Sequence, residues 1–257
     1  MLNVEFYEKL ARIYDAEHAT KVEDLALYSE LADETGGPIL DVGCGSGRVM
    51  LALAQEGHRV VGIDNAQAML DRGQRHLDQT PQLKPLVTFV KGDALTTPLP
   101  DPFKLIIVPY NTFMHFEDQA TQIAALRRFH ELLDKDGMLV IDLPNASEAF
   151  GSDDVGSVVL ERTFDEPETG RFVMQHSVSS LERITQQLHV TWIYDEIGPD
   201  GLVYRTLAPL ILRYVFTAEM DLMLELTGFH RLTTYGDDDQ MPFEEGCPRM
   251  IVLAEKA

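Results

Sequence analysis

The sequence contains little cysteine or tryptophan: two cysteines, Cys44 and Cys247, and one tryptophan among 257 residues. Two cysteines provide no disulfide framework, which excludes the small secreted folds that depend on one. No apolar run approaches the length needed to cross a bilayer. Residues 1–6 carry neither a basic region nor a long apolar core, so we expect no secretory signal. These absences predict a cytoplasmic protein.

Basic residues are also scarce. The 21 lysines and arginines are outnumbered by 42 aspartates and glutamates, which gives a net charge of -21. A field of that sign repels phosphate backbones and anionic membrane surfaces, so we expect neither nucleic acid nor a membrane as a partner. Solubility is the simplest reason for the acidity, and a high-salt or thermophilic source would also explain it.

Signatures of several enzyme classes are missing as well. The chain has no G-x-x-x-x-G-K-[ST] phosphate loop and no G-x-S-x-G nucleophile turn. Four histidines (His18, His58, His76 and His130) fall on separate predicted elements, so we predict no metal site.

The most informative stretch that is present is the segment 39–48, Ile-Leu-Asp-Val-Gly-Cys-Gly-Ser-Gly-Arg. It predicts a short strand, a glycine turn and the start of a helix, which together open a nucleotide-binding type of α/β unit. The glycines Gly43, Gly45 and Gly47 let the backbone bend tightly and approach a ligand closely. A dinucleotide fingerprint would place its third glycine one position later, where this chain has Arg48.

Asp41 lies just before this turn and indicates the charge of the ligand. Its carboxylate would oppose a pyrophosphate but would accept from an ammonium group, which favours a cationic ligand without phosphate. The pattern D-x-G-x-G-x-G over residues 41–47 resembles motif I of the class I S-adenosylmethionine-dependent methyltransferases. The resemblance implies S-adenosyl-L-methionine as the cofactor and S-adenosyl-L-homocysteine as its product. The implied cofactor contacts in this segment are Asp41, Gly43, Cys44, Gly45, Gly47 and Arg48.

Two later acids fit the same kind of site. Asp64 ends the predicted strand 59–64 at about the interval from the glycine turn at which a second-strand acid meets a ribose. The alternative is that Asp64 caps the next helix, although Asn65 can do so instead. The resemblance implies that Asp93, which follows the third strand in a Gly-Asp-Ala sequence, accepts from the adenine amine. It also places three neighbours at the cofactor: Asn65, Met69 and Ala94.

Apolar periodicity predicts five strand–helix units in succession. The predicted strands are 39–42, 59–64, the one that opens the segment 87–95 (a strand and its loop), 103–108 and 137–143. This alternation gives a doubly wound, mainly parallel sheet. Two amphipathic helices precede it, and a helix and two strands follow near the C-terminus, the last strand antiparallel as in the family. The predicted fold is therefore α/β, a seven-stranded Rossmann-like methyltransferase sheet.

From about residue 157 the pattern changes to strands alone. Four segments separated by Pro-Glu-Thr-Gly and Gly-Pro-Asp-Gly turns predict an antiparallel β insertion after the fifth strand: 158–164, 172–181, 184–194 and 202–216. The insertion resembles the small sheet that covers the active site of glycine- and aminosugar-type N-methyltransferases. A homodimer interface is the alternative, and both can hold. The expected domains are an N-terminal lid (1–36), a cofactor-binding domain (37–150 and 217–257) and the insertion (151–216).

Candidate catalytic residues lie in the N-terminal helices and after the fourth strand. Residues past the carboxyl end of a central strand lie where cofactor meets substrate, which places Pro109 and Tyr110 at the cofactor. His115 follows them, and a histidine matches its position in the resembling sugar N-methyltransferases, so we predict a general base there. Tyr14 resembles a tyrosine of the family's lid and is the second catalytic candidate, with Tyr7 a weaker one. The alternative for each is a structural role.

These observations predict an S-adenosylmethionine-dependent methyltransferase that acts on an amine or a hydroxyl of a small molecule. The type that it most resembles is the bacterial aminosugar N,N-dimethyltransferase. Two other functions stay open at this point. One is a non-catalytic S-adenosylmethionine-binding regulator, and the other is a nicotinamide-dependent oxidoreductase, which the missing last glycine disfavours.

Overall fold

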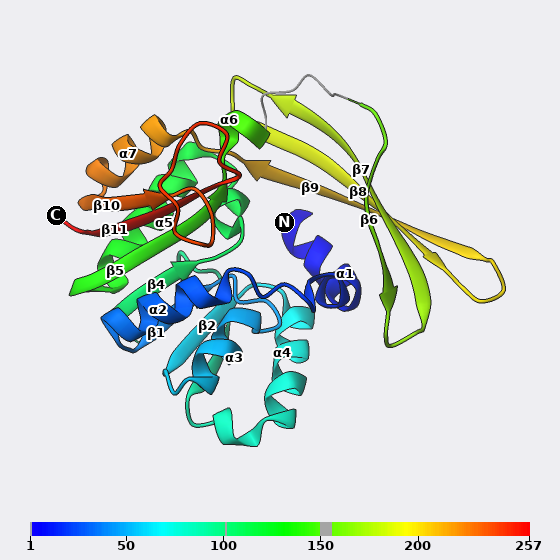
Figure 1. Cartoon of the computed structure of the whole chain (residues 1–257), viewed down its shortest axis with the longest axis horizontal. Coiled ribbons are helices and arrows are strands. Elements are labelled where there is room, and N and C mark those ends of the chain that lie inside the picture. The colour runs from blue at the N-terminus through cyan, green and yellow to red at the C-terminus, as the bar shows by residue number, and fades with distance from the viewer. Residues whose placement is uncertain (1, 101, 150–155) are drawn as a thin grey trace.

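The computed structural model describes residues 2–100, 102–149 and 156–257. The fold consists of a seven-stranded sheet and a four-stranded sheet. Figure 1 shows helices flanking the larger sheet, the smaller sheet projecting from it, and helix α1 (Leu2–His18) between the two. The other helices are α2 (Leu25–Thr35), α3 (Arg48–Gln55), α4 (Gln67–Gln79), α5 (Gln119–Leu132), α6 (Ala146–Ala149) and α7 (Thr217–Leu226), with 3₁₀ turns η1 (Pro81–Leu83) and η2 (Thr112–His115). None of the described helices is both long and apolar enough to cross a membrane.

The larger sheet has the strand order β10-β11-β5-β4-β1-β2-β3. Its members are β1 (Ile39–Val42), β2 (Val60–Asp64), β3 (Val87–Lys91), β4 (Phe103–Val108), β5 (Leu133–Pro144), β10 (Phe229–Tyr235) and β11 (Arg249–Lys256). Strands β1 to β5 pair in parallel, and β11 is antiparallel to both of its neighbours. The predicted fold class is confirmed. Strand β5 begins earlier than expected, because Leu133 already pairs with Phe103 before the register shifts.

The side chains of β1 alternate between two apolar clusters, one on each face of the sheet. Leu40 and Val42 pack with residues of α5 and α7, whereas Ile39 packs with residues of α2, α3 and α4. Burial on both faces explains why the central strands are almost continuously apolar. Strand β1 has β2 on one side and β4 on the other, so the connecting helices diverge at its carboxyl end and leave a crevice there.

The insertion is an antiparallel sheet with the order β6-β7-β8-β9. Its strands are β6 (Val159–Glu166), β7 (Arg171–Glu182), β8 (Gln187–Ile197) and β9 (Val203–Arg213). Strand β8 begins later than expected because Gln186, at φ 58°, still belongs to the turn. The expected domain boundary at 150/151 lies outside the described residues.

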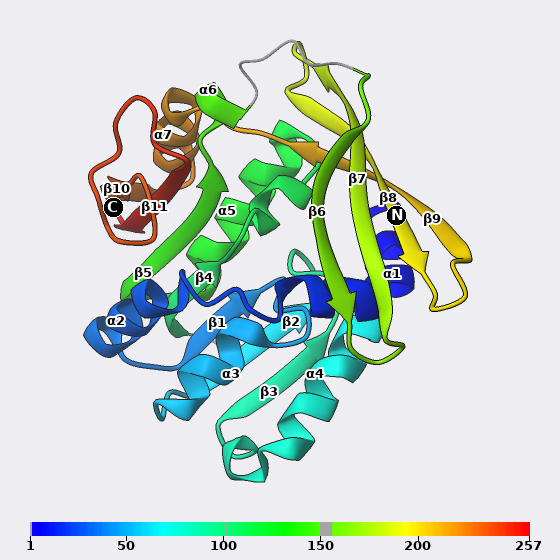
Figure 2. The same ribbon diagram turned by 45° about the vertical axis from the view of Figure 1, so that its right-hand side comes forward.

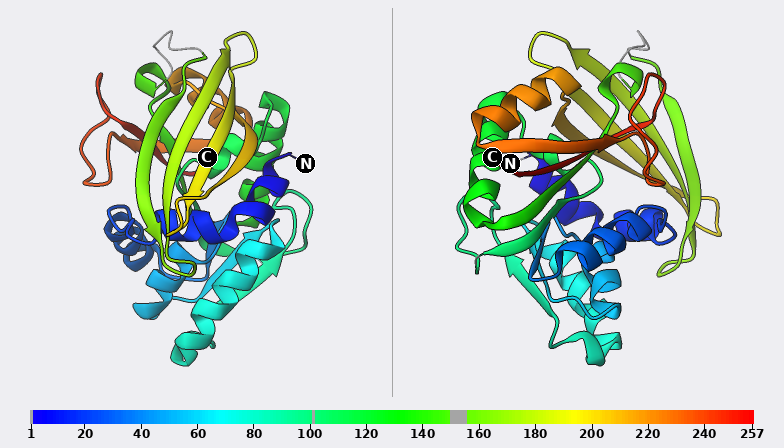
Figure 3. Two further views of the ribbon diagram at one scale, coloured as in Figure 1. Left: turned by 90° about the vertical axis from the view of Figure 1, so that its right-hand side faces the viewer. Right: turned by 60° about the vertical axis from the view of Figure 1, so that its left-hand side comes forward.

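Helix α1 packs between the two sheets. Its residues Phe6, Leu10 and Ile13 form one apolar cluster with Val173 and Tyr194 of the insertion. Figures 2 and 3 show α1 running across the carboxyl ends of β1 and β2 with the curved insertion standing over it. The helix therefore covers the crevice, with its apolar face toward the insertion.

Candidate active site

The glycine turn after β1 approaches its neighbours too closely for a side chain. Gly43 has φ +70°, and a Cβ built there would lie 2.5 Å from Cγ2 of Thr112. Gly45 has φ +55° and its N–H donates to Asp64 Oδ2 at 2.9 Å. The turn thus fits between η2 and the end of β2 only as bare backbone.

Two cavities meet at this turn. The larger has a volume of about 720 Å³ and the smaller about 270 Å³. The residues that line both are Tyr14, Gly43, Gly45, Met69, Tyr110 and Thr112. The smaller cavity also brings together Asp64, Asn65, Asp93, Ala94 and His115, and the larger one Asp41, Cys44, Arg48 and Pro109. Gly47 lines neither cavity; it is the N-cap residue of α3, and a Cβ built on it would meet Phe89.

Asp41 is a buried carboxylate without a partner. It is 1% exposed, and no described residue hydrogen-bonds to either of its side-chain oxygens. Burial raises its pKa from 3.8 to about 7, an effect that Arg48 and the backbone of Met50 only partly oppose. A buried acid of this kind needs a cationic partner from outside the protein. The ammonium group of S-adenosylmethionine has the required charge, so the residues present fit this cofactor.

Asp64 and Asp93 converge on the same hollow. Asp64 accepts from the N–H groups of Gly45 and Ala66, which fixes its carboxylate at the bend, and burial raises its pKa. Ala66 is itself the N-cap residue of α4, which has no side-chain cap hydrogen bond, so Asp64 bonds to the residue before the helix and does not cap its first turn. The Asp93 carboxylate accepts a hydrogen bond from the N–H of Leu95, and its side chain is exposed and lines the smaller cavity. The acids expected at a ribose and an adenine thus face one cavity.

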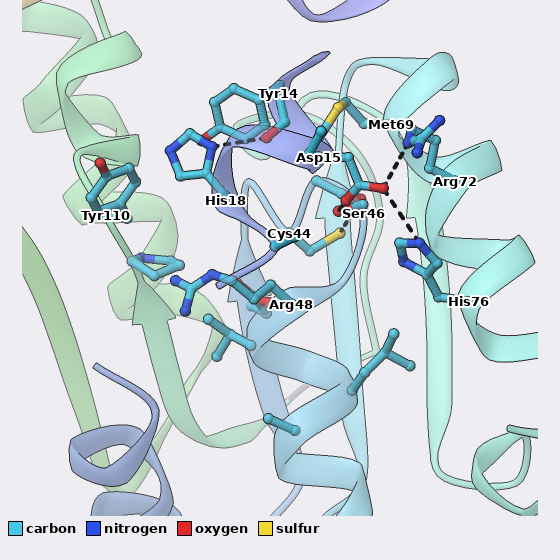
Figure 4. A pocket seen from close by; sticks show the side chains of 18 of the residues that line it. Tyr14, Asp15, His18, Cys44, Ser46, Arg48, Met69, Arg72, His76 and Tyr110 are labelled. Carbon is cyan, nitrogen blue, oxygen red and sulfur yellow. Dashed lines mark hydrogen bonds and ion pairs between the residues drawn. The ribbon is translucent and has the colours of Figure 1, made fainter. Parts of the chain in front are cut away.

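Helix α1 brings aromatic side chains over the cavities. Tyr14 stacks on His18 with ring centroids 4.1 Å apart, and the ring of His18 lies edge-on to Tyr110 at 5.3 Å (Figure 4). Burial raises the pKa of Tyr14 and lowers that of His18 to about 4. Both side chains are therefore uncharged at neutral pH, as a site that must exclude water requires.

His115 lies in the smaller cavity, as expected of a residue after β4. Its Nδ1 is 3.2 Å from Asn3 Nδ2 and its Nε2 is 3.1 Å from the Tyr7 hydroxyl. Burial lowers the pKa of His115 to about 4. Its role as a general base stays a prediction.

Sequence reasoning missed a polar tie between α1 and the cofactor domain. Asp15 accepts from Ser46 at 2.6 Å and from Arg72 at 2.7 Å, and His76 lies 3.3 Å away (Figure 4). These contacts lower the pKa of Asp15 to about 2 despite its partial burial. Arg72 also binds Glu168 at the tip of the insertion. The only signal in the sequence was the Tyr-Asp pair at 14–15.

A second missed residue, Asp142, shapes the loop after β4. It is 1% exposed and accepts from the backbone N–H of Tyr110, from Tyr28 and from Arg249. Tyr110 and Asn111 both have positive φ, 41° and 67°, in the loop that Asp142 holds. Two successive non-glycine residues in this conformation store strain that the surrounding contacts must hold. Strain of this kind cannot be inferred from the order of residues.

Arg48, predicted at the cofactor, has its guanidinium engaged within the protein. Its guanidinium makes a bidentate ion pair with the buried Asp24, with both N···O distances 2.6 Å. It also lines the larger cavity beside Asp41. The pair ties the start of α3 to the segment before α2, so Arg48 positions the turn from behind.

Comparison with known proteins agrees with this geometry. A family model described as a methyltransferase domain matches residues 39–137. The cypemycin N-terminal methyltransferase of a Streptomyces species is 32% identical over 223 residues, which cover 86% of this chain and 84% of that protein. With several other curated relatives, the match spans only about half of their length.

Two solved structures share the complete fold. The CcbJ methyltransferase from Streptomyces caelestis superposes with a TM-score of 0.84 at 23% identity over 98% of both chains. The amino pentose methyltransferase CalS10 from Micromonospora echinaspora, solved with S-adenosylmethionine bound, has a TM-score of 0.71 at 20% identity. That match covers 95% of this chain and 97% of CalS10. With the sequence match over most of the chain, these findings show that this protein belongs to the S-adenosylmethionine-dependent methyltransferases.

Proposed function

We propose that this enzyme methylates an amine or a hydroxyl of a small molecule. The observation that carries the proposal is the cover that α1 and the tip of the insertion give to one side of the larger cavity, about 720 Å³ in volume. Its lining includes Tyr14 and His18 from α1 and Glu168 from the insertion. A space with cover of this kind suits a compact acceptor better than a polymer.

The cofactor supplies an activated methyl group, so the protein's tasks are alignment and the exclusion of water. Asp41 would bind the cofactor's ammonium group, Asp64 its ribose hydroxyls and Asp93 its adenine amine. Tyr14 and Tyr110 line both cavities and would face the reacting centre. Their oxygens and ring faces favour a dispersing positive charge. The catalytic role of Tyr14 remains a prediction of this proposal, as does the place of His115 beside the reacting centre.

An amine is the favoured acceptor group. A third cavity, about 290 Å³ in volume, reaches Tyr110 and is lined by Glu17, Glu23 and Asp238 together with Lys21 and Arg162. Burial raises the pKa of Glu17 and of Asp238, as expected for acids in a shared, partly dry space. A cavity lined by more acidic than basic side chains attracts cationic amines and raises their concentration near the site. The name of the cypemycin relative describes that protein as an N-terminal methyltransferase, and the N-terminus of a peptide carries an amine.

Two measurements test the proposal. Calorimetric titration with S-adenosylhomocysteine should show binding, and Asp41→Asn serves as the matched variant with weakened binding. Incubation with S-adenosylmethionine and a panel of small amines and alcohols should release S-adenosylhomocysteine, with amines the better acceptors. Binding without turnover on any member would favour the non-catalytic regulator instead. The nicotinamide alternative is set aside by the family assignment.

Two sequence-based expectations accompany the proposal without a structural test. A homodimer through the insertion is checked by light scattering on the purified protein. A cytoplasmic location is checked by fractionation of cells that express it.

A further inference from the structure

A series of hydrogen bonds links β9, the start of α1, the segment after β4 and again α1. Asn3 contacts the backbone of Ile211, His115 contacts Asn3, and Tyr7 contacts His115. Asn3 is 8% exposed, whereas His115 and Tyr7 are half-buried and line the smaller cavity. This series of hydrogen bonds thus begins in the protein interior and ends at the smaller cavity.

The amide of Asn3 has one permitted orientation. Its Oδ1 accepts from the N–H of Ile211 at 3.2 Å, and its Nδ2 donates to the C=O of the same residue at 2.8 Å. A backbone N–H can only donate and a backbone C=O can only accept, so exchanging the two amide atoms would break both bonds. The second hydrogen of Nδ2 is therefore available to the nitrogen of His115 that lies 3.2 Å away.

That orientation decides which nitrogen of His115 carries the proton. Because Asn3 donates to Nδ1, this nitrogen must present its lone pair, and the proton of a neutral ring must be on Nε2. We propose that Asn3 holds His115 as the Nε2–H tautomer, so that His115 is a positioning residue that donates to Tyr7 and not the general base. The tautomer of His115 can be tested without a substrate. Only the kinetic tests of this inference rest on the proposed function, because they need a methyl acceptor.

The consequence falls on Tyr7. Its oxygen accepts from His115 Nε2–H, and among the described residues no other side chain or backbone group hydrogen-bonds to this hydroxyl. The Tyr7 proton is therefore free to be donated into the cavity, to an oxygen or nitrogen lone pair of the bound cofactor or acceptor. Edge-on contacts with His115 and with Tyr14, at 5.5 Å and 5.2 Å between ring centroids, fix the Tyr7 ring.

The charged surroundings are compatible with this arrangement. Burial raises the pKa of Tyr7, and the carboxylates of Asp64 and Glu17 and the hydroxyls of Tyr194 and Tyr110 raise it further, so Tyr7 keeps its proton at neutral pH. The shift at His115 has burial as its only cause. The described neighbours thus supply no acid that would stabilise an imidazolium ring.

A direct test needs no acceptor. Long-range proton–nitrogen NMR on ¹⁵N-histidine-labelled protein reports which ring nitrogen is protonated, and the His115 signals are those missing from His115→Gln. We expect a protonated Nε2 and a bare Nδ1. In Asn3→Asp, a carboxylate faces Nδ1, so the proton should move there and the pKa of His115 should rise. A protonated Nδ1 in the unaltered protein would overturn the proposal even if no substrate were ever found.

Kinetics then separate a donor from a base. The amide of Gln can donate to Tyr7 and accept from Asn3 but cannot take up a proton. We expect His115→Gln to be at least tenfold more active than His115→Ala, and the cost of His115→Ala to disappear in a Tyr7→Phe background. A general base would make both His115 variants equally poor, by about 10²–10⁴-fold.

The ligand that Tyr7 contacts is identified by the same variant. If Tyr7→Phe weakens S-adenosylhomocysteine binding, the contact is to the cofactor. If it leaves that affinity unchanged and raises KM for the acceptor, the contact is to the acceptor. If it changes neither, Tyr7 does not contact the ligand and the proposal fails.

Discussion

Asp41→Asn is the sharpest test of the cofactor site, because it should make the cofactor-free protein more stable and weaken the binding of the cofactor. The folded-state pKa of Asp41 is about 7 and its ordinary value is 3.8. Between these values the folded chain holds a proton that the unfolded chain has released. The stability of the cofactor-free protein therefore falls as pH rises from about 4 to about 7, and the loss is complete above that window.

The magnitude follows from the size of the shift. About three pKa units at roughly 1.4 kcal/mol each give a penalty on the order of 4 kcal/mol at pH 8. Asparagine has the same shape and no charge, so Asp41→Asn should recover up to about 4 kcal/mol at pH 8 and almost nothing at pH 4. Loss of a charge-assisted hydrogen bond, worth roughly 1.5–3 kcal/mol, should weaken S-adenosylhomocysteine binding by about 10–100-fold.

Urea unfolding at the two pH values and calorimetric titration supply the measurements. Asp142→Asn is the control, since Asp142 is equally buried but is paired with Arg249 and Tyr28. Breaking that pair should cost roughly 3–5 kcal/mol at pH 8, with no gain in return. If Asp41→Asn also lost stability at pH 8, Asp41 would be paired within the protein and the reasoning would be refuted.

Three further predictions concern the bend, the adenine end and the lid. Gly43→Ala should cost about 1–2 kcal/mol of stability through its positive φ and abolish measurable S-adenosylhomocysteine binding. Gly57→Ala, equally left-handed but with nothing within 4 Å, should cost stability alone, and equal binding by both variants would contradict this. Asp93→Ala should weaken binding about tenfold in calorimetry and cost no more than about 1 kcal/mol of stability in urea, because the side chain is exposed and accepts a hydrogen bond from Leu95. Asp15 raises the pKa of His76, so their attraction is complete below pH 6.5 and is lost as pH rises through the raised value. Asp15→Asn should therefore destabilise the protein more at pH 6 than at pH 9 and speed hydrogen exchange in α1, and an equal effect at both pH values would rule out the histidine's contribution.

Local pattern was enough to predict the fold and the convergence of the acids. The apolar runs at 39–42 and 59–64 are short and bounded by turn residues, which is typical of buried strands, and they are too short for a helix. Once the strands are parallel neighbours, Asp64 must end beside Gly45, because the carboxyl ends of β1 and β2 lie at one edge. The position of the crevice followed from the order of elements alone.

Contacts between segments far apart in the chain could not be predicted from the sequence. Asn3 and His115 are separated by 112 positions, and nothing in either neighbourhood marks the other as its partner. Even the base assignment at His115 depended on a matching position and not on its hydrogen bonds. The protonation of an imidazole is set by its neighbours, which only the tertiary structure supplies.

The carboxylates show the same limit most clearly. Asp24, Asp41 and Asp142 are all buried, yet Asp24 faces Arg48, Asp142 faces Arg249, and Asp41 faces no cation that bonds to it. In a chain with 42 acidic residues, the residue type alone cannot distinguish these cases. A paired buried acid stabilises the scaffold, whereas an unpaired one destabilises it until a ligand arrives. The free energy that the free protein loses at Asp41 is therefore available to bind the cofactor's ammonium group, which links the instability of the empty site directly to its affinity.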